Sequence, residues 1–181
     1  MPTLETEQQI DGVPLRLARS ALYYDFGGDN PDDMRRQIDD AKPDVGSGRW
    51  DAYTRWQVYW TFQRSQQGEQ CQVTSAHVEL NLTFMLPRWT PATEPTPELK
   101  AHWRRYMTSL ITHEEGHANH GVACAREISA ALIHAAGAPD CATLDSTLNA
   151  EAHRVVDKFG AEDVEYDYAT QHGASQGAVF P

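Results

Sequence analysis

The feature that most constrains the fold is a helical pattern in the second half of the chain. It begins at Pro97 and reaches Ala136, where Gly137 and Pro139 close it. Pro is favoured in the first turn of a helix and Gly just beyond its end, so both boundaries carry the expected signals. A helix of about 40 residues is long for a globular protein, so a bend or a second start is expected near Ser109.

The long helix contains the pattern H-E-x-x-H, from His113 through Glu114 to His117. Residues four apart on an α-helix lie about 40° apart around the axis and about 6 Å apart along it, so both imidazoles point the same way. Two such imidazoles can bind one zinc ion at about 2.0–2.1 Å. The carboxylate of Glu114 could take a proton from a metal-activated water and pass it to the leaving group. The pattern favours a zinc hydrolase, and the alternative is a pair of histidines that only pack.

A catalytic zinc site needs a third protein ligand, and the long helix does not supply one. In the metzincin pattern a third His would stand at position 123 and a Gly at position 120, but these positions hold Ala123 and His120. His120 shares the face of the two histidines but lies a further turn away. We therefore interpret it as a residue that supports the ligands without binding the metal itself. Glu127 lies about 15 Å along the axis from His117, which is too far. Cys124 is interpreted as a small core residue.

The third ligand is therefore expected after the long helix. A Gly-rich segment near the C-terminus can bring side chains to a site without regular secondary structure. His172 in this segment is the favoured ligand, and Asp167 and Glu151 are the alternatives. Either Tyr166 or Tyr168 could donate a hydrogen bond to the oxyanion of the reaction, and Tyr168 is our candidate for that catalytic role.

Strands dominate the first half of the chain. Residues 13–26 alternate between apolar and polar side chains, which indicates one or two strands. Residues 50–63 are rich in aromatic and β-branched side chains, and residues 71–86 alternate clearly. The short polar connection at 65–70 predicts that these two strands form an antiparallel hairpin.

Two shorter helices complete the predicted α+β fold. Asn30 followed by Pro31 indicates an N-capped helix that runs to about Ala41. A last helix is predicted over residues 144–159, followed by an irregular tail. The expected order is an N-terminal antiparallel β-sheet with one helix, then the long helix, then the second helix. One domain over 1–181 is expected, with a β-rich part at about 13–90, a helical part at about 97–160 and a C-terminal loop at about 161–181.

Composition excludes several classes of protein. The 181 residues include 26 acidic and 15 basic side chains, and the net charge of −11 repels polyanions, so nucleic acid is not an expected partner. The mean hydropathy is −0.59, and no apolar run approaches the ~20 residues of a membrane span. The polar, acidic N-terminus does not have the pattern of a signal peptide. Cys71, Cys124 and Cys141 form no C-x-x-C pair, and either one disulfide or three thiols fits their spacing.

Four sequence patterns together resemble a known family. They are Trp103-x-x-Tyr106-x-x-x-Leu110 before the H-E-x-x-H pattern, Asp51-Ala52-x-Thr54-x-Trp56, Leu86-Pro87-x-Trp89, and Tyr166-Asp167-x-x-Thr170-x-His172-Gly173-x-x-Gln176-Gly177-Ala178. From about residue 20 onward the chain resembles a bacterial family of secreted zinc-dependent proteases, formerly described as a domain of unknown function.

The resemblance implies a zincin-like peptidase domain in a periplasmic or secreted protein. It implies zinc at His113 and His117, with Glu114 as the catalytic residue, and its T-x-H-G pattern supports His172 as a ligand. The cysteine positions of the family imply a Cys71–Cys141 disulfide, with Cys124 as an additional cysteine.

The expected function is that of a zinc-dependent peptidase that hydrolyses peptide bonds in a peptide or protein substrate. A catalytically silent zinc-binding domain that mediates periplasmic interactions is the first alternative, and a plain α+β binding domain is the second. The sequence leaves the substrate and the oligomeric state open.

Overall fold

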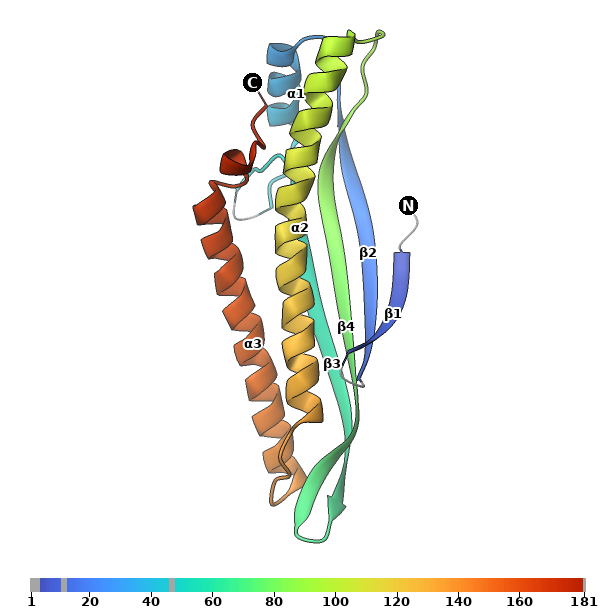
Figure 1. Cartoon of the computed structure of the whole chain (residues 1–181), viewed down its shortest axis with the longest axis vertical. Coiled ribbons are helices and arrows are strands. Elements are labelled where there is room, and N and C mark those ends of the chain that lie inside the picture. The colour runs from blue at the N-terminus through green and yellow to red at the C-terminus, as the bar shows by residue number, and fades with distance from the viewer. Residues whose placement is uncertain (1–3, 11–12, 46–47, 181) are drawn as a thin grey trace.

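The protein is an elongated, three-layered molecule in which two long helices are stacked on one face of a β-sheet (Figure 1). The structure, a computed structural model, describes residues 4–10, 13–45 and 48–180. Its elements are, in chain order, β1 (Leu4–Ile10), β2 (Val13–Phe26), α1 (Pro31–Ala41), β3 (Tyr53–Gln67), β4 (Gln70–Trp89), α2 (Pro97–Ile133), α3 (Cys141–Thr170) and a 3₁₀ turn (Ala174–Gln176).

The sheet is mixed, and the expected purely antiparallel sheet is wrong. Its strand order is β1-β2-β4-β3. The β3–β4 hairpin is antiparallel as predicted, and it turns at Gly68, which has a φ of 63°. However, β2 pairs parallel with β4. Strand β4 is the more apolar strand of the hairpin, so docking it against β2 gives it the central position and leaves the more polar β3 at the edge.

The core lies between the sheet and α2. The inward-facing side chains of β4 alternate with outward-facing ones and are all buried; they are Val78, Leu80, Leu82, Phe84 and Leu86. Helix α2 follows its N-cap Thr96 and runs without interruption from Pro97 to Ile133, so it has no second start near Ser109. At Gly121 a Cβ atom would lie 2.7 Å from the Cβ of Trp56, so this glycine allows α2 to approach β3 closely.

Helix α3 is much longer than the sequence indicated. It was expected to end near Phe159, but it continues to Thr170 and ends at Gln171, whose φ is 52°. Gly160, the residue after the predicted end, lies inside the helix, and a Cβ atom there would meet no neighbour. Residues 161–170 are therefore helical rather than part of a C-terminal loop, because their inward face packs on α2 through the side chains described below.

The disulfide implied by the family resemblance is present. It joins Cys71 at the start of β4 to Cys141 at the start of α3, whereas Cys124 is a buried free thiol. Such a bridge is compatible with export to an oxidising compartment. In the described part of the chain, no helix combines the length and apolarity needed to cross a membrane.

The position of Gly160 inside α3 can be tested by substitution. Gly160→Ala should raise the free energy of unfolding by about 0.5–1 kcal/mol, because Ala loses less backbone entropy and its methyl group meets no neighbour. Gly121→Ala is the control and should lower it, because its methyl group would collide with Trp56. Urea unfolding measures both. A destabilised Gly160→Ala variant would contradict a helix that continues to Thr170.

Candidate metal centre

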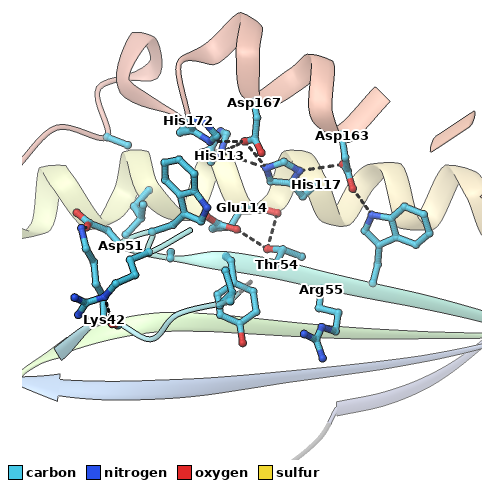
Figure 2. A pocket seen from close by; sticks show the side chains of 18 of the residues that line it. Lys42, Asp51, Thr54, Arg55, His113, Glu114, His117, Asp163, Asp167 and His172 are labelled. Atoms are coloured by element: carbon cyan, nitrogen blue, oxygen red, sulfur yellow. Dashed lines mark hydrogen bonds and ion pairs between the residues drawn. The ribbon is translucent and has the colours of Figure 1, made fainter. Parts of the chain in front are cut away.

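Two acidic side chains of α3 face the two histidines of the H-E-x-x-H pattern. Helix α3 runs back along α2, so that Asp167 lies beside His113 and Asp163 lies beside His117 (Figure 2). Each pair is spaced by four residues, which places its members on one helix face. The antiparallel packing of the two helices therefore gathers four titratable side chains on the wall of a cleft of about 590 Å³.

Three donor atoms in this cluster have the spacing of metal ligands. The Nε2 atoms of His113 and His117 are 3.2 Å apart, and Oδ1 of Asp167 lies 3.2 Å from the first and 3.1 Å from the second. Three ligands of a tetrahedral zinc at about 2.0–2.1 Å lie about 3.3 Å from one another. The spacing of this triangle of three atoms therefore fits the ligands of one zinc ion.

The outer nitrogens of both imidazoles have acceptors of their own. His113 Nδ1 donates to Oε1 of Gln176 at 3.1 Å, and His117 Nδ1 donates to Oδ1 of Asp163 at 2.9 Å. In the neutral form of both rings, which metal binding requires, the protons stay on Nδ1 and each Nε2 lone pair faces the carboxylate of Asp167. Three electron-pair donors thus converge on one point, which is the arrangement that binds a cation.

The electrostatics of the cluster also favour a positive charge. Burial opposes protonation of His117, but Asp163 and Asp167 outweigh it and raise its pKa to about 10. Burial raises the pKa of Asp167, whereas the contacts with His113 and His117 lower it. The contacts outweigh burial, so the pKa of Asp167 lies well below the usual range of an aspartate. Both shifts show that the two carboxylates stabilise a cation among these side chains.

Glu114 lies on the sheet side of the donor cluster (Figure 2). Its side chain lines the cleft but is only 2% exposed, and burial is the main cause that raises its pKa. Thr54 Oγ1 on β3 donates to Oε2 of Glu114 at 2.7 Å. This bond fixes one carboxylate oxygen and leaves the other for a proton from the cleft.

Asp163 connects the cluster to the sheet. Its Oδ1 accepts from His117 and also from His120 Nδ1 at 2.6 Å, and its Oδ2 accepts from Trp56 Nε1 at 2.5 Å. His117, His120 and Asp163 form a second group of close donor atoms. Because this group contains the outer nitrogen of His117, we interpret it as the hydrogen-bonded support of the first group.

The structure does not bring every expected residue to the metal centre. His172 lines the cleft but is 46% exposed at its side chain, and its ring stacks on Trp50 at 3.9 Å between centroids. Its Nδ1 lies 3.3 Å from Oδ1 of Asp167, so it contacts the donor cluster from outside. Tyr168 is 86% exposed, and Glu151 pairs with Arg154 on the surface. Asp167, which was an alternative, completes the triangle.

Sequence reasoning gave no role to three residues that form hydrogen bonds with His117, Glu114 and His113. They are Asp163, Thr54 and Gln176. One signal was present: the four-residue spacing of Asp163 and Asp167 repeats that of His113 and His117, as expected for facing helix faces. The role of Thr54 depends on which strand lies beside α2, which no local pattern reveals.

Comparison with known proteins places the chain in a family. No curated protein and no solved structure matches it. A family model described as "Bacterial protein of unknown function (DUF922)" matches residues 22–173. This match covers most of the chain, including the H-E-x-x-H pattern, Asp163 and Asp167. The protein therefore belongs to the bacterial DUF922 family.

Proposed function

We propose that the protein is a zinc-dependent peptidase. The observation that carries the proposal is the triangle of His113, His117 and Asp167 beside the buried carboxylate of Glu114, all on the wall of one cleft. Two imidazoles and one carboxylate are a common ligand set of catalytic zinc. The same set also occurs in Fe(II) oxygenases, but a buried carboxylate beside the ligands suits hydrolysis, which needs a base.

The residues have distinct roles in the proposed reaction. His113, His117 and Asp167 would hold the metal, whose Lewis acidity activates a water and polarises the substrate carbonyl. Glu114 accepts one proton of that water as the water oxygen forms its bond to the carbonyl carbon. Glu114 then delivers the proton to the amide nitrogen as the C–N bond breaks, which yields a carboxylic acid and an amine. Thr54 holds Glu114 in place throughout.

The shape of the cleft supports a peptide substrate. Eight consecutive residues, from Arg49 to Trp56, line it. Successive side chains of an extended chain point in opposite directions, so an unbroken run of lining residues indicates that the backbone also faces the cleft. This stretch includes the start of β3, which is an edge strand in the described sheet. The free edge of a strand can pair with an extended peptide through backbone hydrogen bonds.

The ligand set can be tested by measuring zinc affinity. Asp167→Ala should weaken zinc binding by more than the roughly 10–100-fold typical of outer partners, because it removes a ligand. His172→Ala should have a smaller effect, because His172 only contacts Asp167. Competition with a chromogenic chelator measures both affinities. If His172→Ala releases the metal while Asp167→Ala keeps it, the triangle described here is not the metal site.

The role of Glu114 can be tested separately from metal binding. Glu114→Gln should retain zinc but lose about 10²–10⁴ in the rate of hydrolysis, because an amide cannot accept the proton of the water. Glu115→Gln is the matched control, since Glu115 pairs with Arg19 on the surface, and it should leave the rate unchanged. Cleavage of a mixed peptide library, followed by mass spectrometry, measures the activity. Wild-type protein that binds zinc but cleaves nothing would favour the catalytically silent zinc-binding domain.

A further inference from the structure

The chain reverses its direction directly after α3 and returns to α2. Gln171, His172 and Gly173 all have positive φ angles, of 52°, 51° and 82°. Two successive non-glycine residues in this conformation cost free energy, and such strain persists only where the surrounding structure imposes it. At Gly173 a Cβ atom would lie 3.0 Å from Cγ of His113, so the returning backbone lies directly against that imidazole.

The returning segment then presents Gln176 to the same imidazole. The side-chain oxygen of Gln176 accepts from His113 Nδ1 at 3.1 Å, and its Nε2 donates to the hydroxyl of Tyr166 at 3.0 Å. The ring of Tyr166 stacks on that of His113 with a centroid distance of 5.0 Å. Gln176 is therefore oriented from two sides, and its oxygen is the nearer of two acceptors that can keep the proton of His113 on Nδ1, the other being Thr170 Oγ1 at 3.4 Å.

The end of the segment is fixed by packing. Phe180 is 5% exposed and lies within 5.1–5.6 Å, between ring centroids, of His102, Trp103 and Tyr106 on α2. Gly177 has a φ of 92°, and a Cβ atom there would lie 3.0 Å from Oγ of Ser109. The backbone hydrogen bonds of residues 176–178 remain within the segment, so side-chain contacts attach it to α2.

We propose that Gln176 is a positioning residue of the metal centre, and that the segment Gln171–Phe180 is a C-terminal clasp that Phe180 anchors. The clasp acts through His113: it fixes the tautomer and the ring orientation, so that the Nε2 lone pair faces Asp167 and His117. This inference rests on the proposed metal centre but not on peptidase activity. It explains why Gly173 and Gln176 of the C-terminal pattern lie against His113, and why Gly177 lies against Ser109, one helical turn before it.

Substitutions of Gln176 test the positioning role. Gln176→Leu, which removes the acceptor at similar size, should weaken zinc affinity by about 10–100-fold. The zinc affinity of Gln176→Glu should equal or exceed that of the wild type. A carboxylate at this position can accept from His113 Nδ1 in the same way that Asp163 accepts from His117 Nδ1. Long-range ¹H–¹⁵N spectra of the metal-free protein give a second measurement. Wild type and Gln176→Glu should show the Nδ1–H tautomer of His113, and Gln176→Leu should lose it.

Substitutions at the end of the clasp test the anchor. Phe180→Ala should increase the hydrogen-exchange rates of the amides of Gln176, Gly177 and Ala178, and should weaken zinc affinity several-fold. Val179→Ala is the matched control, because Val179 is adjacent but 60% exposed, and it should change neither quantity. Gln176→Glu introduced into the Phe180→Ala variant should not restore the affinity, because the side chain is no longer held near His113.

The outcomes separate this inference from the proposed function. If the wild type binds zinc and Gln176→Leu binds it equally well with an unchanged His113 tautomer, the positioning role is wrong and the peptidase proposal stands. If the wild type binds zinc but cleaves no peptide, and Gln176→Leu still lowers the affinity, the peptidase proposal fails and the clasp stands. Equal effects of Phe180→Ala and Val179→Ala would remove Phe180 as the anchor.

Discussion

The register between α2 and α3 is the constraint on which the candidate site depends. His113 and His117 lie one turn apart on α2, and they face Asp167 and Asp163, which lie one turn apart on α3. A slip of one residue in either helix would turn these side chains by about 100° and separate them. The pairing is supported by two contacts of α3 that precede the site. The Cys71–Cys141 bridge fixes the start of α3, and Lys158 pairs with Glu127 of α2 between the bridge and the site.

The sheet contributes to the site through two inward-facing residues of one strand. Thr54 and Trp56 are two apart on β3, so they share a face, and they contact Glu114 and Asp163 respectively. The carboxylates of Glu114 and Asp163 are thus both held by the same short stretch of strand. This stretch also lines the cleft, so the part of the chain that would bind substrate is the part that orients the acidic groups.

Local patterns predicted much of the fold, and long-range packing explains the errors. The Asn30 cap, the β3–β4 hairpin and α2 follow from neighbouring residues and were predicted correctly. The parallel pairing of β2 with β4 depends on contacts between distant segments, which a single sequence does not specify. The predicted end of the last helix at Phe159 was wrong, because contacts between α3 and α2 outweigh the low helix propensity of Gly160. This one error placed Asp167 in a loop and made His172 the preferred ligand.

A bound metal would be a second cross-link of α3 beside the disulfide, with a consequence for the stability of the protein. The disulfide ties one end of the helix to β4, and a cation bound by His113, His117 and Asp167 would tie the other end to α2. A ligand that binds only the folded state stabilises it in proportion to the logarithm of its free concentration. The first tie depends on the redox state of the compartment and the second on its metal content. The stability of the C-terminal half would therefore respond to two separate chemical properties of its surroundings.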